Sequence, residues 1–115
     1  MTPDLVVLLA TFPEEDSAAR IAGVLVSEQL VACVNVLPAV NSIYRWQGVV
    51  TSAREVLAVM KTRSDLVDAV ISRVKELHPY DVPEVIALPV VAGLPAYLQW
   101  VMAETIQESV KGSVP

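Results

Sequence analysis

Cysteine and histidine are each present only once in this 115-residue chain, as Cys33 and His78. A single cysteine cannot form an intrachain disulfide, and one subunit cannot supply the several thiolates of a cysteine-rich metal site. This cysteine usage is typical of a reducing compartment, so we expect a cytoplasmic protein.

Basic residues are also few, because eight Lys and Arg stand against thirteen Asp and Glu, a formal net charge of -5. Proteins bind nucleic acids largely through Lys and Arg that displace counterions from phosphates. The chain has no Lys/Arg cluster, so we do not expect it to bind nucleic acid.

Long apolar runs are missing as well. No run approaches the roughly 20 residues that a membrane-spanning helix needs. The first segment, Met1 to Ala10, has no basic residue and no small-residue cleavage site, and acids follow it directly. We therefore expect neither a membrane anchor nor an export signal.

Signatures of catalysis are absent too. The chain has only four glycines and contains no Gly-rich phosphate loop, nucleophile elbow, zinc-type cluster or Cys-x-x-Cys pair. The sequence therefore favours a protein that is not an enzyme.

Apolar residues are abundant instead: they make up 54% of the chain, and the mean hydropathy is +0.53. A chain of this length supports one core, so we expect a single domain over residues 1–111 and a frayed tail over 112–115. Apolar surface beyond the needs of that core normally lies in subunit contacts. We therefore expect permanent association with other subunits.

The hydrophobic periodicity predicts an α+β fold. One helix follows Pro13, a second begins at Ser64 and ends at Pro79, and a third follows Pro95. The predicted strands are Leu5–Ala10, Val31–Leu37 with a continuation to Trp46, Arg54–Thr62, and Val85–Val91. The order βαββαβ plus a C-terminal helix is that of a ferredoxin-like sandwich with helices on one sheet face.

The second and third predicted strands should form an unusually long β-hairpin. Pro38 is expected to bend its first strand, and a polar turn is expected within Gly48–Ala53. A long two-stranded arm is stable only with hydrophobic cover, which another subunit would supply.

Five segments resemble the CutA, or divalent-cation tolerance, family. They are ACVNVLP (32–38), SIYRWQG (42–48), MKT (60–62), LHPYDVPEVIALPV (77–90) and YLQW (97–100). The resemblance covers nearly the whole chain. It implies a ferredoxin-like subunit, a homotrimer joined through sheet edges, an architecture like that of PII signalling proteins, and a link to tolerance of copper and other divalent ions.

Copper binding in some members of that family is attributed to a cysteine at the end of the first strand and two adjacent histidines before Pro-Tyr. The matching positions here are Ala10, Leu77 and His78. His78 is thus the candidate metal ligand for a divalent cation such as copper, but one imidazole alone does not hold copper tightly. A capping role at the end of the second helix is the favoured alternative.

Four polar residues are candidates for a ligand cleft between subunits: Lys61, His78, Tyr80 and Glu84. Salt bridges across the interface are the alternative explanation for these charges. Cys33 lies among apolar residues and is expected to be a buried, inert thiol.

Tyr44, Trp46 and Trp100 could stack against a planar ligand. Large aromatic residues are more often anchors of an interface, so we predict that these three lie in the trimer interface.

Three functions follow from these observations. The leading one is a homotrimeric, non-enzymatic protein of divalent metal-ion tolerance and response that binds a metal ion or small ligand in its inter-subunit clefts. The second is a PII-like sensor that binds a small effector or a partner protein. The third is a structural assembly module without a small ligand.

Overall fold

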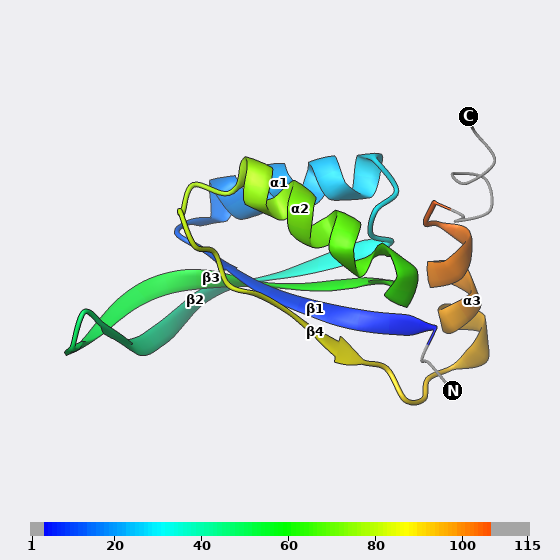
Figure 1. Cartoon of the computed structure of the whole chain (residues 1–115). Helices are drawn as coiled ribbons and strands as arrows, with labels where there is room; N and C mark the ends of the chain where they lie inside the picture. Colours follow the sequence, from blue (N-terminus) through cyan, green and yellow to red (C-terminus); the bar gives the residue numbers. More distant parts are fainter. Residues whose placement is uncertain (1–3, 107–115) are drawn as a thin grey trace.

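A computed structural model describes residues 4–106 (Figure 1). The predicted order of strands and helices is confirmed, while the tail predicted at 112–115 lies outside the described residues. The elements are β1 (Leu5–Phe12), α1 (Glu15–Ser27), β2 (Cys33–Trp46), β3 (Val49–Arg63), α2 (Val67–Leu77), β4 (Val85–Pro89) and α3 (Pro95–Ala103). A short 3-10 turn, Ser64–Leu66, precedes α2.

The four strands form one antiparallel sheet in the order β2-β3-β1-β4. β1 is central, as its continuous apolar run predicts, and it extends past Ala10 to Phe12. β4 is an edge strand, in keeping with Pro89, because proline cannot donate a ladder hydrogen bond. β4 ends at Pro89, two residues before the predicted end.

The main core lies between the sheet and the two helices α1 and α2, which cover one face (Figure 1). Helical and strand periodicities bring their apolar stripes together there. The fully buried side chains of this core include Leu8, Phe12, Ile21, Leu25, Met60, Val70 and Val74.

The opposite sheet face is only partly covered. Strand register places Val7 and Leu9 of β1 beside Leu88 and Ile86 of β4, and these two β4 side chains are 47% and 48% exposed. Helix α3 packs at one end of this face, where Val101 is fully buried in a small second core. The rest of the face stays open in the single subunit, and its β4 side chains are apolar.

The β2–β3 hairpin extends well beyond the end of β1 (Figure 1). The predicted bend at Pro38 is confirmed, because the β2–β3 register shifts between Leu37 and Val40, where Ala39 has a φ of 62°. The predicted window for the turn was only partly right, because it includes Gly48 but not Gln47. Gln47 and Gly48 form a two-residue turn with φ of 50° and 81°, and β3 therefore begins at Val49.

Candidate functional site

His78 is buried directly after α2, with 7% of its surface exposed. Its Nε2 lies 2.7 Å from the Thr11 carbonyl oxygen, and its Nδ1 accepts a hydrogen bond of 3.0 Å from the Tyr80 amide. These partners select the neutral ring in which Nε2 carries the proton. The ring also stacks on Phe12 at 4.7 Å between centroids. His78 thus fastens the end of α2 to the end of β1.

Tyr80 extends this cluster to the base of the hairpin. Its hydroxyl donates a 2.8 Å hydrogen bond to Glu55 Oε2, and its ring lies 4.8 Å from that of His78. Burial, followed by the hydrogen bond to Glu55 and the charge of Glu55, raises the pKa of Tyr80 to about 12. Tyr80 is therefore a protonated donor that holds the nearly buried Glu55 carboxylate.

Lys61 belongs to a second polar group on the open sheet face. The β2–β3 register places Lys61 opposite Cys33, and Asn35 is the next residue of β2 on the same face. The Lys61 ammonium donates to Asn35 Oδ1 and lies 3.9 Å from Cys33 Sγ. Cys33 is half-buried at the start of β2, so the expectation of a buried thiol was wrong.

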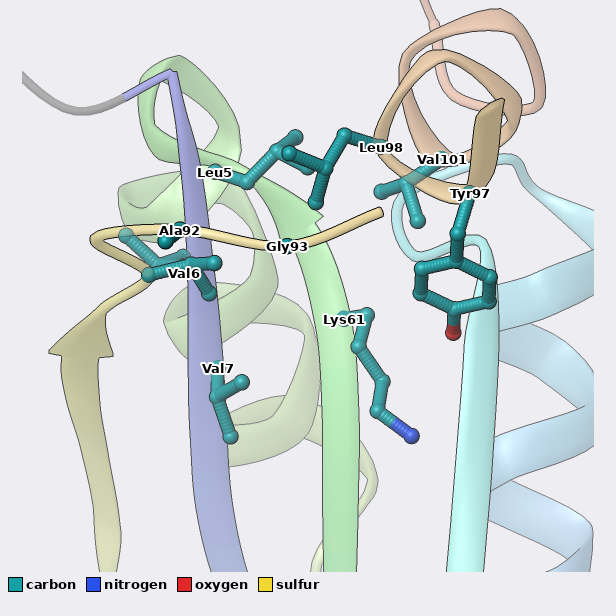
Figure 2. A pocket seen from close by; sticks show the side chains of 10 residues that line it. Leu5, Val6, Val7, Lys61, Ala92, Gly93, Tyr97, Leu98 and Val101 are labelled. Atoms are coloured by element: carbon teal, nitrogen blue, oxygen red, sulfur yellow. The ribbon is translucent and has the colours of Figure 1, made fainter. Parts of the chain in front are cut away.

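An apolar cavity of about 190 Å³ adjoins Lys61 (Figure 2). Its walls come from β1, from the connection after β4, and from α3, and its lining residues include Leu5, Val7, Val90, Gly93, Leu98 and Val101. In Figure 2 the side chains of Lys61 and Tyr97 extend in a similar direction, with their polar atoms directed away from Leu5, Leu98 and Val101.

The four predicted cleft residues do not form one cluster within the subunit. Lys61 pairs with Val7 of β1, whereas His78 bonds to Thr11, which is four residues or about 13 Å further along the strand. Glu84 is exposed immediately before β4, whose first residue pairs with Ala10 at the His78 end.

The predicted interface aromatics lie at opposite ends of the subunit (Figure 1). Tyr44 and Trp46 are on the hairpin and are 44% and 60% exposed. Trp100 is 44% exposed on α3, where its ring contacts that of Tyr97.

The family model described as CutA1 divalent ion tolerance protein matches residues 6–104. The chain belongs to this family. The name of the CutA1 family describes ion tolerance and not a catalytic activity.

Individual CutA proteins are similar over most of this chain. "Protein CutA 1, chloroplastic" of Oryza sativa subsp. japonica is 45% identical over 100 residues, which cover 87% of this chain and 56% of the rice protein. "Divalent-cation tolerance protein CutA" of Thermus thermophilus is 48% identical over 99 residues, 86% of this chain and 96% of that protein. The chain thus spans little more than half of the rice protein and nearly all of the bacterial one.

Solved CutA1 structures share the fold. The protein from Thermus thermophilus superposes with a TM-score of 0.87 at 46% identity and covers 89% of this chain and 99% of its own. The Oryza sativa CutA1 crystal structure has a TM-score of 0.89 at 43% identity, covering 92% of this chain and 97% of its own. Within residues 4–106, which the structure describes, no helix is long and apolar enough to cross a membrane.

The residues of one subunit do not fit the copper site that the resemblance implies. Ala10 is fully buried in the core, Leu77 packs against it, and both nitrogens of His78 already have backbone partners. Among residues 4–106 no three His, Cys, Asp or Glu side chains are grouped as metal ligands would be. A metal ion at His78 would have to displace the Thr11 carbonyl or the Tyr80 amide.

Sequence reasoning missed several partners in the two clusters. Glu55 has the sequence surroundings of an ordinary strand residue, and the Thr11 contact is made by a backbone oxygen, which no residue type indicates. Asn35 and Tyr97 also went unnoticed as neighbours of Lys61. The signal for Tyr97 lies in the YLQW segment (97–100), which the chain shares with the CutA family.

Proposed function

We propose that this CutA1-family protein is a cytoplasmic homotrimer that takes part in tolerance of divalent metal ions without catalysing a reaction. The observation that supports the trimer is the apolar surface that stays open on the single subunit. The metal-ion role comes from the family and from the names of its relatives.

The open apolar surface has two parts. One is the sheet face with Ile86 and Leu88, and the other is the hairpin, where Ile43, Trp46 and Val50 are 73%, 60% and 70% exposed. Exposed apolar surface of this extent normally marks an interface. The edge strands β2 and β4 also leave backbone groups available for pairing with another chain.

The position of the aromatics favours a ring. Tyr44 and Trp46 lie on the hairpin, and Trp100 lies on α3 at the other end. Contact between two unlike patches is heterologous, and such contacts close into a ring when the rotation between subunits fits. Three subunits in a PII-like arrangement would satisfy this geometry and would form clefts between neighbouring subunits.

Light scattering coupled to size exclusion tests the trimer. We expect a mass three times the 12.4 kDa subunit. Trp46→Ser should shift the mass towards the single subunit, whereas Val26→Ser, a matched exposed apolar residue on α1, should leave it unchanged. A folded wild-type protein with the mass of one subunit would reject the proposed assembly and its clefts.

The metal role of His78 stays a prediction. Titration calorimetry with copper and with zinc on tag-free protein should give isotherms that change on His78→Ala if His78 is a ligand. Identical isotherms would show that His78 is not a metal ligand. Circular dichroism must first verify that the variant is folded.

A sensor of a small effector is the second candidate, and the cavity beside Lys61 and Tyr97 favours it. A thermal-shift screen of nucleotides and small anions tests this function, because a ligand that binds only the folded state raises the melting temperature. No shift with any compound would favour the structural assembly module instead.

A further inference from the structure

The cavity beside α3 combines an apolar interior with a polar rim. Its interior is formed by aliphatic side chains such as Leu5, Leu98 and Val101, and its rim carries the Lys61 ammonium and the Tyr97 hydroxyl (Figure 2). Ligand sites generally combine an apolar wall with a few polar groups that fix orientation. The cavity volume of about 190 Å³ is below that of sites for drug-sized molecules and suits a ligand of a few carbon atoms.

The Lys61 ammonium places a positive charge at the rim, and its hydrogen-bond partner Asn35 is neutral. Lys61 donates to Asn35 and lies near Cys33, and within residues 4–106 no carboxylate forms an ion pair with it. An ammonium with only a neutral hydrogen-bond acceptor retains the capacity to bind an anion.

Tyr97 supplies a neutral donor at the same rim. Burial, followed by the electrostatic interaction and the hydrogen bond with Cys33, raises the pKa of the Tyr97 hydroxyl. The hydroxyl therefore keeps its proton near neutral pH and can donate it to an anionic oxygen.

We propose that this cavity binds a small aliphatic monocarboxylate, with the carboxylate on Lys61 and Tyr97 and the alkyl chain among Leu5, Leu98 and Val101. One cation and one hydroxyl match the single charge and the two oxygens of a carboxylate. A phosphate dianion needs more donors than this rim offers, and an organic cation would be repelled by Lys61.

The narrow interior depends on a close approach of the chain before α3. A Cβ at Gly93 would come within 2.8 Å of Leu98 Cδ2, so a larger residue at this position would push the Leu98 side chain aside. Leu98 is one of the walls of the cavity.

This inference deepens the sensor function by naming its ligand class, and it rests on that candidate. The cavity adjoins the sheet face proposed for the trimer, but its lining residues all belong to one subunit, so ligand binding and subunit mass are two separate measurements. A protein that binds the carboxylate as a single subunit would reject the trimer alone.

Ligand-observed NMR titrations with hexanoate, acetate and hexylammonium test the proposal on the full-length protein. A buried methylene strengthens binding about fourfold, so hexanoate should bind at least about tenfold more tightly than acetate. Hexylammonium should bind at least about tenfold more weakly than hexanoate. Lys61→Met should weaken hexanoate binding at least about tenfold, the loss expected for one charge-assisted hydrogen bond.

Two further variants keep the test decisive. Lys75→Met, which removes an exposed lysine on α2, should bind hexanoate like the wild type. Tyr97→Phe removes only the hydroxyl of a residue that is 40% exposed, so the risk to folding is small, and it should weaken hexanoate binding several-fold. The proposal is overturned if the wild type does not bind hexanoate, if acetate or hexylammonium binds equally well, or if folded Lys61→Met and Tyr97→Phe both bind like the wild type.

Discussion

Replacement of His78 by alanine should destabilise the protein by about 3 to 4 kcal/mol. The substitution removes the hydrogen bond to the Thr11 carbonyl and the acceptor of the Tyr80 amide, each worth about 1 kcal/mol. It also removes the stacked contact with Phe12, worth about 1 kcal/mol, and leaves space beside a ring that is itself 1% exposed.

A second variant separates the ring from its nitrogens. His78→Phe keeps an aromatic ring against Phe12 but loses both hydrogen bonds, so it should cost about 2 kcal/mol. Ser72→Ala, at an exposed position of α2, is the control and should change the free energy of unfolding by less than about 0.5 kcal/mol.

Urea denaturation followed by circular dichroism measures these differences. The subunit concentration must be held constant, because the stability of an associating protein depends on it. A loss below about 1 kcal/mol for His78→Ala would show that the ring does not fasten α2 to β1, and the structural role of His78 would have to be given up.

Tyr80, the turn residue Gly48 and the bulge residue Ala39 give further predictions. The folded-state pKa of Tyr80 is raised to about 12, so its contribution to the free energy of unfolding is fully present below pH 10 and is lost as the pH rises from 10 to 12. Denaturation at several pH values should show this loss of stability in the wild type and a smaller loss in Tyr80→Phe. Gly48→Ala should cost about 1 kcal/mol, because Gly48 has a φ of 81° and open space around its Cβ position, so the cost is conformational. Ala39→Gly should instead stabilise by about 0.5 to 1 kcal/mol, because Ala39 has a φ of 62°; equal signs for the two substitutions in thermal melts would contradict this explanation.

Much of the fold could be predicted because its signals are local. The apolar run that starts at Leu5 indicates a central strand, and the spacing of Val67, Val70 and Val74 indicates an amphipathic helix. The turn was harder to predict, since Gln47 adopts a positive φ that is unusual for a residue with a side chain. The role of His78 at the end of α2 was the favoured alternative, but its partner across the sheet is a backbone oxygen that the sequence cannot indicate.

The Lys61 group shows why the rest of the site could not be read from sequence. If the strand pairing continued from the Gln47–Gly48 turn without a bulge, Cys33 would lie opposite Thr62, which is a core residue. Cys33 and Asn35 would then point to the helix-covered face of the sheet. The extra residue accommodated at Pro38 and Ala39 shifts the register by one and brings Cys33 opposite Lys61 instead. A single bulge therefore brings the Lys61 ammonium, the Asn35 amide and the Cys33 thiol together on the open face beside the cavity.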